Sequence, residues 1–196
     1  MTDYFALLDQ PRRPWLQPER LKQAFHAKAL HAHPDAHAQH GDAESSDGLF
    51  AQLNEAHRVL QDPKLRLHHL LTLTGHPPDR AASAAPSNID ELFPLVAAAT
   101  HQASAVVQKS AVATNALSRS LLKAELQKAT QQVNGAHDRV SELQERALSE
   151  LQQLDRVWSD ADEGQVAQLS QLHLQLSYLT RWVAELHEKR VQLAIA

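Results

Sequence analysis

The sequence contains no cysteine, and only 5% of its 196 residues are aromatic. The absence of cysteine excludes disulfides and thiolate metal sites, and it is typical of a reducing compartment. Glycine is scarce as well, with five residues in all, and no segment shows the short strands and regular turns of a β protein. Alanine, leucine and glutamine, which favour helix, dominate the second half of the chain. We therefore predict an all-α protein.

Two further absences concern location and partners. No uninterrupted apolar run approaches the roughly 20 residues that a membrane-spanning helix needs, and the first residues, MTDYFALLDQ, lack the basic and apolar regions of a secretory signal. The net charge of −4 gives no reason to expect nucleic acid or an anionic membrane as the main partner. We expect a soluble cytoplasmic protein without nucleic-acid or membrane partners.

The first part of the chain has the pattern of a helical hairpin. Apolar residues at spacings of three and four predict helices over about 18–32 and 49–60, with polar residues 42–48 between them. The two stripes are Leu21, Phe25, Ala29 and Ala32, then Phe50, Leu53, Ala56 and Leu60. The first helix should stop at Pro34, because a proline pushes the residue before it out of the α region. A short helix over residues 4–8 should cover the hairpin, and a further helix should run from Pro63 to Gly75.

The second part predicts an antiparallel three-helix bundle over residues 88–196, separated from residues 1–76 by a proline-rich linker, 77–87. Asn88 to Glu91 has the pattern of a capping box, although Pro94 then requires a kink or a second helix start. Asn134-Gly135 is predicted to break the helices, and residues 159–164 to form a polar loop. The clearest apolar stripes are Val140, Leu143, Ala147, Leu151, Leu154 and Trp158, then Leu172, Leu176, Leu179, Val183 and Leu186.

Four segments in this order resemble the J-domain, the module that stimulates the ATPase of DnaK-type chaperones. They are DYFALL at 3–8, PERLKQAFHAKALHA at 18–32, the tripeptide His33-Pro34-Asp35, and LNEAHRVLQDP at 53–63. The run RLHHLLTLTG at 66–75 narrows the resemblance to J-proteins of the HscB type, which serve iron–sulfur cluster assembly. The resemblance implies a J-domain over 1–76 and a client-binding bundle over 88–196. It also implies two partners, a DnaK/HscA-type ATPase and an IscU-like scaffold protein.

The resemblance assigns the ATPase contact to the tripeptide and to the helix before it. In this reading Pro34 fixes the turn, His33 and Asp35 present hydrogen-bonding groups, and Lys22, Lys28 and His26 belong to a basic face. A lone tripeptide of this kind can instead be a simple helix stop, and the face can be an ordinary solvated surface. The chain departs from the family at Ala32 and Ala36, where an aromatic and a basic residue are usual.

The client contact implied by the resemblance comprises Leu92, Phe93, Val96 and Tyr178. The alternative is that these side chains fill the bundle core. At three positions where the family usually has glutamates the chain has Ala97, Thr100 and Ser104. Two other interpretations therefore stay open, a J-domain protein with a different client and an adaptor that no longer stimulates an ATPase.

No pattern for catalysis or for a cofactor was found in the sequence. His31, His33, His37 and His40 lie close together, but no HExxH spacing accompanies them. Nucleophile and phosphate-loop motifs such as GxSxG are absent as well. We predict a protein that is not an enzyme and has no metal or cofactor site, and a metalloenzyme is the alternative from another class.

Overall fold

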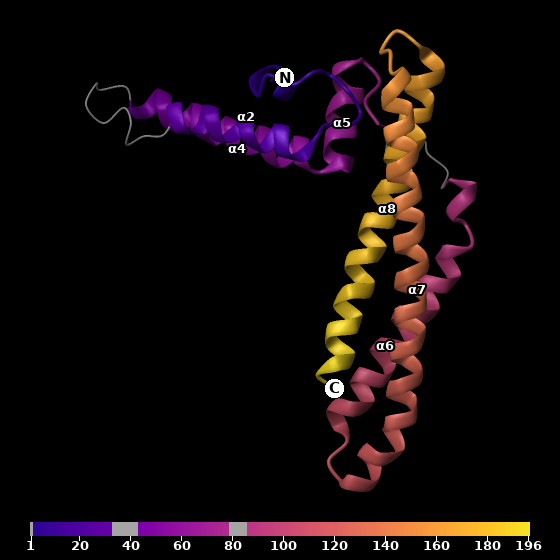
Figure 1. Ribbon diagram of the computed structural model, residues 1–196. Coiled ribbons are helices and arrows are strands. Elements are labelled where there is room, and N and C mark those ends of the chain that lie inside the picture. The colour runs from indigo at the N-terminus through magenta and orange to yellow at the C-terminus, as the bar shows by residue number, and fades with distance from the viewer. Residues whose placement is uncertain (1, 33–42, 79–85) are drawn as a thin grey trace. The chain divides into compact units, whose positions relative to one another are not determined.

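The computed structural model describes residues 2–32, 43–78 and 86–196, and in these the chain is helical without strands. The helices are α1 (Tyr4–Leu7), α2 (Pro18–Ala32), α4 (Ala43–Gln61), α5 (Pro63–Leu73), α6 (Leu92–Val112), α7 (Ala116–Val157) and α8 (Glu163–Ala194), with a 3₁₀ turn, η1, at Ser87–Ile89 (Figure 1). The all-α prediction is confirmed. Within the described ranges, none of these helices combines the length and apolar character that crossing a membrane requires.

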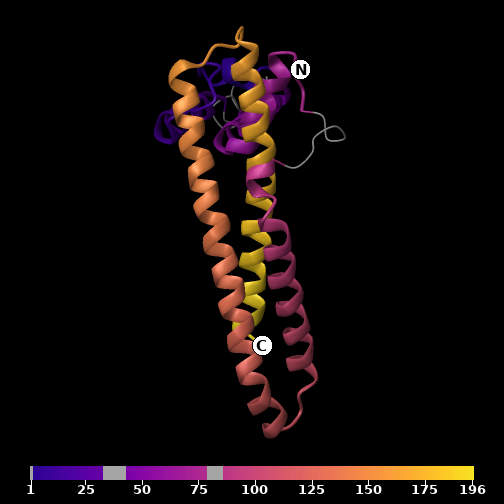
Figure 2. The same ribbon diagram turned by 90° about the vertical axis from the view of Figure 1, so that its right-hand side faces the viewer.

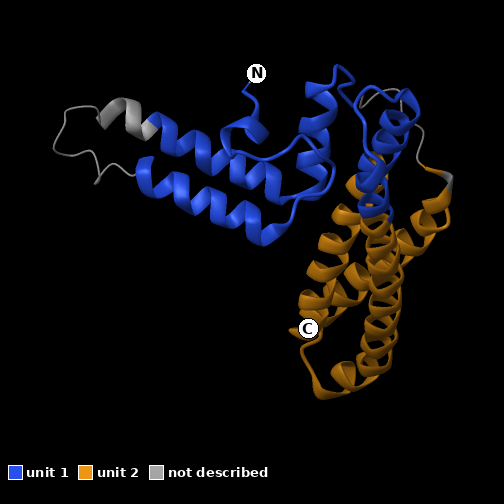
Figure 3. Ribbon diagram, turned by 45° about the horizontal axis from the view of Figure 1, so that its top comes forward, with its two compact units in different colours: residues 1–82, 150–173 blue, residues 83–149, 174–196 orange. Residues whose placement is uncertain are grey.

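The chain forms two compact units, which are coloured separately in Figure 3. The first comprises Met1–Ala82 and Glu150–His173, and the second comprises Ser83–Ser149 and Leu174–Ala196. The change from one unit to the other after Ala82 falls inside the predicted linker. Residues 150–173, which we assigned to the bundle, belong to the unit that holds α1 to α5.

In the first unit α2 and α4 lie side by side and antiparallel, as the sequence predicts, and α1 packs on α4 (Figure 1). Leu21 and Ala32 of α2 are buried, as are Leu53, Ala56 and Leu60 of α4, which confirms these members of the two stripes, while Phe25, Ala29 and Phe50 are partly exposed. Helix α4 starts earlier than expected, at Ala43, so that most of the segment predicted as a polar loop is helical.

Both ends of α5 have the predicted signals. The carboxylate of Asp62 accepts a hydrogen bond from the Leu65 N–H at 3.1 Å, and Pro63 occupies the first turn, where a missing N–H has no cost. At the other end Gly75 has a φ of +83°, the Gly75 N–H bonds to the Thr72 carbonyl and the His76 N–H bonds to the Leu71 carbonyl. This pair of bonds is a Schellman motif, which favours glycine at the left-handed position.

The second unit is a bundle of α6, part of α7 and the later part of α8. Helix α7 runs antiparallel to the other two, as Figures 1 and 2 show. Each helix contributes one apolar stripe to the core: Val96, Ala99, Ala103 and Val106 from α6, Ala129, Val133, Ala136 and Val140 from α7, and Leu176, Leu179, Trp182 and Leu186 from α8. The polar loop is also present, because α7 ends at Val157 and α8 begins at Glu163.

Two sequence predictions about the bundle were wrong. Helix α7 continues through Asn134-Gly135, and the break between the first two helices lies instead at residues 113–115. Glycine inside a helix costs only about 1 kcal/mol relative to alanine, and the burial of Val133, Ala136 and Val140 around Gly135 outweighs that cost. The capping box at Asn88 does not form either. Helix α6 starts at Leu92 with Pro94 in its first turn, which is the second helix start that Pro94 required.

Substitutions at Gly135 and Gly75 provide a matched test of the continuous α7 helix and of the glycine cap after α5. A Cβ at Gly135 would meet no atom within 4 Å, so Gly135→Ala should raise the free energy of unfolding by about 0.5–1 kcal/mol. Gly75→Ala should lower it, because alanine is strained at a φ of +83° although space is available. Urea denaturation of both variants measures the two differences. A destabilised Gly135→Ala protein would contradict the continuous helix.

Candidate functional site

The tripeptide His33-Pro34-Asp35 lies outside the described residues, but the helices on either side of it are described. On α2 the side chains of Arg20, Lys22 and His26 are exposed. Among the described residues no carboxylate lies within ion-pair distance of Arg20 or Lys22. This face therefore presents unpaired positive charge to solvent, which is what contact with an acidic protein surface requires.

Lys28 differs from the other cations of this face. Its Nζ lies 2.8 Å from Oδ1 of Asp9, a residue in the turn after α1 with a φ of +52°. Lys28 is about one-third exposed and Asp9 about three-quarters exposed. An ion pair of this kind contributes little to stability, but it cancels much of the positive field of Lys28 at a distance. Of the two lysines predicted for the contact, Lys22 is the one whose charge stays available.

An aromatic layer joins α2 to α4 beneath the basic face. The Phe25 ring stacks on His57 of α4 with centroids 4.4 Å apart and an angle of 22°, and it also contacts His26 at 5.5 Å. Burial, with the nearby charges of His26 and Lys22, lowers the pKa of His57. His57 is therefore neutral at pH 7 and acts as a packing residue. It was not among the predicted site residues, although it lies one residue after Ala56 of the second stripe.

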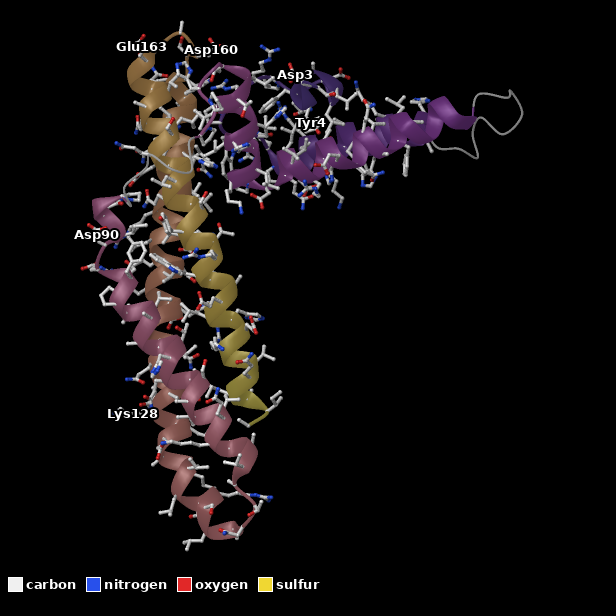
Figure 4. The ribbon with its side chains drawn as sticks, turned by 180° about the vertical axis from the view of Figure 1, so that it is seen from behind. Asp3, Tyr4, Asp90, Lys128, Asp160 and Glu163 are labelled. Carbon is white, nitrogen blue, oxygen red and sulfur yellow. The ribbon has the colours of Figure 1, made fainter. Side chains whose placement is uncertain are left out.

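The base of this hairpin is fixed by α1 and by His69 of α5. The Asp3 carboxylate caps α1 through the Phe5 N–H at 3.0 Å and pairs with Arg12 at 2.6 Å. The Tyr4 N–H donates to Nε2 of His69 at 3.1 Å, and the Tyr4 ring stacks on the same imidazole at 4.6 Å. Figure 4 labels Asp3 and Tyr4 at this corner. Because Nε2 must accept a hydrogen bond, His69 is neutral here, and burial lowers its pKa accordingly.

The structure divides the four predicted client-contact residues into two pairs. Leu92 is 1% exposed and Val96 is 3% exposed, so both belong to the bundle core, which was the alternative considered for them. Phe93 and Tyr178 are partly exposed. Phe93 follows Leu92 by one residue, a turn of about 100° around α6, which takes its side chain out of the core.

Phe93 and Tyr178 meet in an aromatic cluster with Trp182, which was not among the predicted site residues. The Phe93 ring packs edge-on against Trp182 at 4.7 Å and against Tyr178 at 5.3 Å. Trp182 is only 3% exposed, so it forms the floor of the cluster, and Arg181 lies 5.6 Å from the centre of the Tyr178 ring. The spacing of four between Tyr178 and Trp182 was the available signal, because such residues share a helix face.

An open groove of about 670 Å³ lies between α6 and α8, one turn beyond this cluster. Its lining residues are Ala97, Ala98, Thr100, His101 and Ser104 of α6, with Glu185 and Lys189 of α8. The three positions where glutamates were expected thus lie along the groove, and their side chains are small. The surface can accept a bulky side chain here, whereas it offers one carboxylate, Glu185, for a basic one.

The residues considered for a metal site give no cluster in the described part of the chain. His33, His37 and His40 lie outside it. Elsewhere in the described ranges no three His, Asp or Glu side chains come close enough together to hold a metal ion.

The first third of the chain matches a known domain family. Residues 3–69 match the DnaJ domain. A co-chaperone protein HscB homolog of Bordetella pertussis is 40% identical over 75 residues, which are 37% of this chain and 44% of that protein. The homolog of Chromobacterium violaceum is 35% identical over 75 residues, 37% of this chain and 43% of its own length. In sequence, the chain therefore matches less than half the length of these relatives.

Solved structures extend the likeness to the whole fold. Chaperone HscB from Vibrio cholerae superposes with a TM-score of 0.64 over 98% of this chain and 99% of its own, at 19% identity. Human co-chaperone protein HscB superposes with a TM-score of 0.50 over 97% of this chain and 83% of its own, at 16% identity. At these identities the comparison establishes the fold.

Proposed function

We propose that the chain, which matches the DnaJ domain over residues 3–69 and shares its fold with solved HscB structures, is a co-chaperone of iron–sulfur cluster assembly. It stimulates the ATPase of a DnaK/HscA-type chaperone through His33-Pro34-Asp35, and its bundle binds an IscU-like scaffold protein. The observation that carries the proposal is the position of this tripeptide, between α2 and α4 and inside the matched residues 3–69. The protein itself performs no chemistry in this role.

The ATPase contact is supported by the charge on α2. Exposed cations accelerate the encounter with an acidic surface and fix its orientation, whereas they add less to the final affinity. Arg20 and Lys22 are exposed and His26 extends the same face, while Lys28 is held by Asp9. The contact then depends on a small number of charges, and the tripeptide supplies the specificity.

The client contact is supported by the partly exposed aromatic rings of Phe93 and Tyr178. Aromatic side chains with a buried floor are typical of the residues that dominate binding energy in protein interfaces. Trp182 provides that floor, and the adjacent groove continues the surface along α6. Leu92 and Val96 hold this surface from inside the core and do not contact the client themselves.

Linking the two contacts in one chain gives the mechanism. A scaffold bound to the bundle and an ATPase engaged by the J-domain are held near each other, which raises their effective concentration and triggers hydrolysis where the client is available. A J-protein with a different client is the second candidate. The small side chains at Ala97, Thr100 and Ser104 favour it, because they remove the carboxylates with which the usual scaffold is expected to pair.

His33→Gln should abolish stimulation of a DnaK/HscA-type ATPase while leaving helical content and the melting temperature unchanged. The reason is that the residue belongs to the presented tripeptide and to neither apolar stripe. Single-turnover ATP hydrolysis measures the effect, and His76→Gln, a change at an exposed histidine outside the contact, is the control. Stimulation that survives in His33→Gln would show that the domain does not act as a J-domain. A parent protein without stimulation would leave the adaptor interpretation.

Single substitutions should show which charges of α2 act on the ATPase. Lys22→Glu should slow association with the ATPase by on the order of threefold to tenfold at low salt, because an unpaired charge is reversed. Asp9→Asn should speed association, because it removes the carboxylate that offsets Lys28. Added salt should remove both differences. Stopped-flow association rates test this, with Arg190→Glu on α8 as the control, and equal rates for Lys22→Glu and the parent would exclude this face.

If the aromatic cluster is the client contact, substitutions in the cluster should weaken scaffold binding, whereas substitutions in the core should lower the stability of the bundle. Phe93→Ala combined with Tyr178→Ala should weaken binding of an IscU-type scaffold by about tenfold or more, because two anchor residues are truncated. Leu92→Ala should instead lower the free energy of unfolding by about 2–5 kcal/mol, because it leaves a cavity in the core. Calorimetric titration and thermal melts distinguish these outcomes. Unchanged affinity in the double variant would remove the aromatic cluster from the contact, and a parent that does not bind the scaffold would point to a different client.

A further inference from the structure

The joint between α1 and α5 depends on one imidazole that has to stay uncharged. His69 of α5 is 3% exposed, and its Nε2 accepts a hydrogen bond from the Tyr4 N–H at 3.1 Å. Its ring stacks on Tyr4 with centroids 4.6 Å apart and on Phe5 with centroids 5.7 Å apart. A protonated imidazole carries N–H groups on both ring nitrogens and has no acceptor. Protonation therefore removes this hydrogen bond and leaves two donors facing each other.

Helix α1 is too short to be stable by itself. It has four residues, whereas isolated helices shorter than about 12–15 residues are marginal in water. Two polar contacts hold its first turn, because the Asp3 carboxylate accepts from the Phe5 N–H at 3.0 Å and Tyr4 bonds to His69. Phe5 and Leu8 are fully buried, and α1 packs on α4. A terminal element of this length, held by few contacts, opens at a lower free energy than the core.

The described groups around this joint give a protonated His69 no replacement for the lost bond. The charged and titratable ones are Asp3 at the start of α1, Tyr4 of α1, Arg12 after it, Glu55 and Arg58 of α4, and His68 of α5. Oδ2 of Asp3 pairs with Arg12 at 2.6 Å, and Oδ1 accepts from two N–H groups of α1. Glu55 pairs with Arg58 at 2.6 Å. The rings of Tyr4 and Phe5 attract a cation, but this gain is smaller than the cost of burying a charge without a hydrogen-bond partner.

The surroundings of His69 keep it neutral. Burial lowers the pKa of His69, Asp3 partly opposes this, and His68 and Arg12 lower the pKa further. Because the imidazole is harder to protonate when α1 is docked than when α1 is released, the released state binds the proton first. The joint is complete above the ordinary histidine pKa of about 6.5 and weakens as the pH falls below it. Asp3 stays charged in this range because, although burial acts to raise it, the pKa of Asp3 is lowered by bonds from Arg12 and from the Ala6 N–H.

We infer that His69 is a proton-operated latch, which holds α1 on the first unit at neutral pH and releases it on mild acidification. Release uncovers Phe5 and Leu8, the two side chains that are fully buried while α1 is docked. The turn after α1 carries Asp9, which pairs with Lys28 of α2 at 2.8 Å. Release of α1 therefore also changes the charge that α2 presents to solvent.

Two other histidines of the first unit respond to acid, so the readout has to be local to α1. Burial lowers the pKa of His57, and it lowers the pKa of His173 to about 4. His57 stacks on Phe25 of α2, and His173 contacts His68 of α5, so neither reports the docking of α1. A measurement of global stability would combine all three effects.

Hydrogen exchange in the full-length protein, corrected for the intrinsic effect of pH, tests the latch at the Tyr4 and Leu8 amides. From about pH 7.5 to about pH 5 their protection should fall by up to about tenfold per pH unit, because release takes up one proton. In His69→Gln the side-chain oxygen can still accept from Tyr4 but cannot be protonated, so protection should change less than about twofold. His76→Gln, a change at an exposed histidine after α5, should follow the parent.

An NMR titration of the His69 Cε1–H resonance in the parent is an independent measure, and it decides the question if His69→Gln fails to fold. A midpoint below about 6.5 supports the latch. The latch is overturned by a midpoint at or above that value, by Tyr4 protection that does not fall on acidification, or by an equal fall in His69→Gln. These measurements need neither an ATPase nor a scaffold protein, so their result stands apart from the proposed function.

Discussion

The buried guanidinium of Arg66 is the constraint on which the first unit depends. Arg66 is 3% exposed, its Nε donates to the Pro14 carbonyl at 2.8 Å, and its Nη1 donates to the Leu60 carbonyl at 2.7 Å. Both carbonyls belong to irregular or terminal backbone that has no helix partner, and each would cost about 1–3 kcal/mol if left unsatisfied. Burial lowers the pKa of Arg66 to about 10, so the group still carries its charge at neutral pH. The Trp15 ring, 5.7 Å away, and the charges of Asp62 and Asp155 offset part of the cost of burying it.

Asp155 extends this constraint to the far end of α7. Its carboxylate accepts hydrogen bonds from the Trp15 N–H at 3.0 Å and from Arg13 Nε at 3.2 Å. The segment between α1 and α2 is therefore held from two sides, by Arg66 from α5 and by Asp155 from α7. This explains why Glu150–His173 belongs to the same compact unit as the J-domain helices. The start of α2, and with it the presentation of Lys22, rests on backbone that these polar contacts fix.

Features that depend on local spacing could be predicted from the sequence, whereas those that depend on tertiary contacts could not. The stripe beginning at Leu21, the stop at Asp62-Pro63 and the glycine cap at Gly75 are local, and each was predicted correctly. The continuation of α7 through Gly135 could not be predicted, because it depends on burial against other helices. The pairing of Arg13 with Asp155 joins residues far apart in sequence, and neither residue type signals it. The tripeptide itself could be identified by its neighbours, whereas the aromatic cluster needed the fold to bring Trp182 under Phe93.

Helix α6 shows how one segment can hold a stable core and a changeable surface. Its core stripe and its groove stripe differ by a single residue step, since Val96 is buried and Ala97 lines the groove. Substitution on the groove side leaves no cavity and usually changes stability by less than about 0.5 kcal/mol. The small side chains at Ala97, Thr100 and Ser104 are therefore compatible with an unchanged core, and a TM-score of 0.64 at 19% identity shows that the fold persists while most side chains differ. The buried stripe thus fixes the position of the groove, while the side chains that line the groove can change without loss of the core.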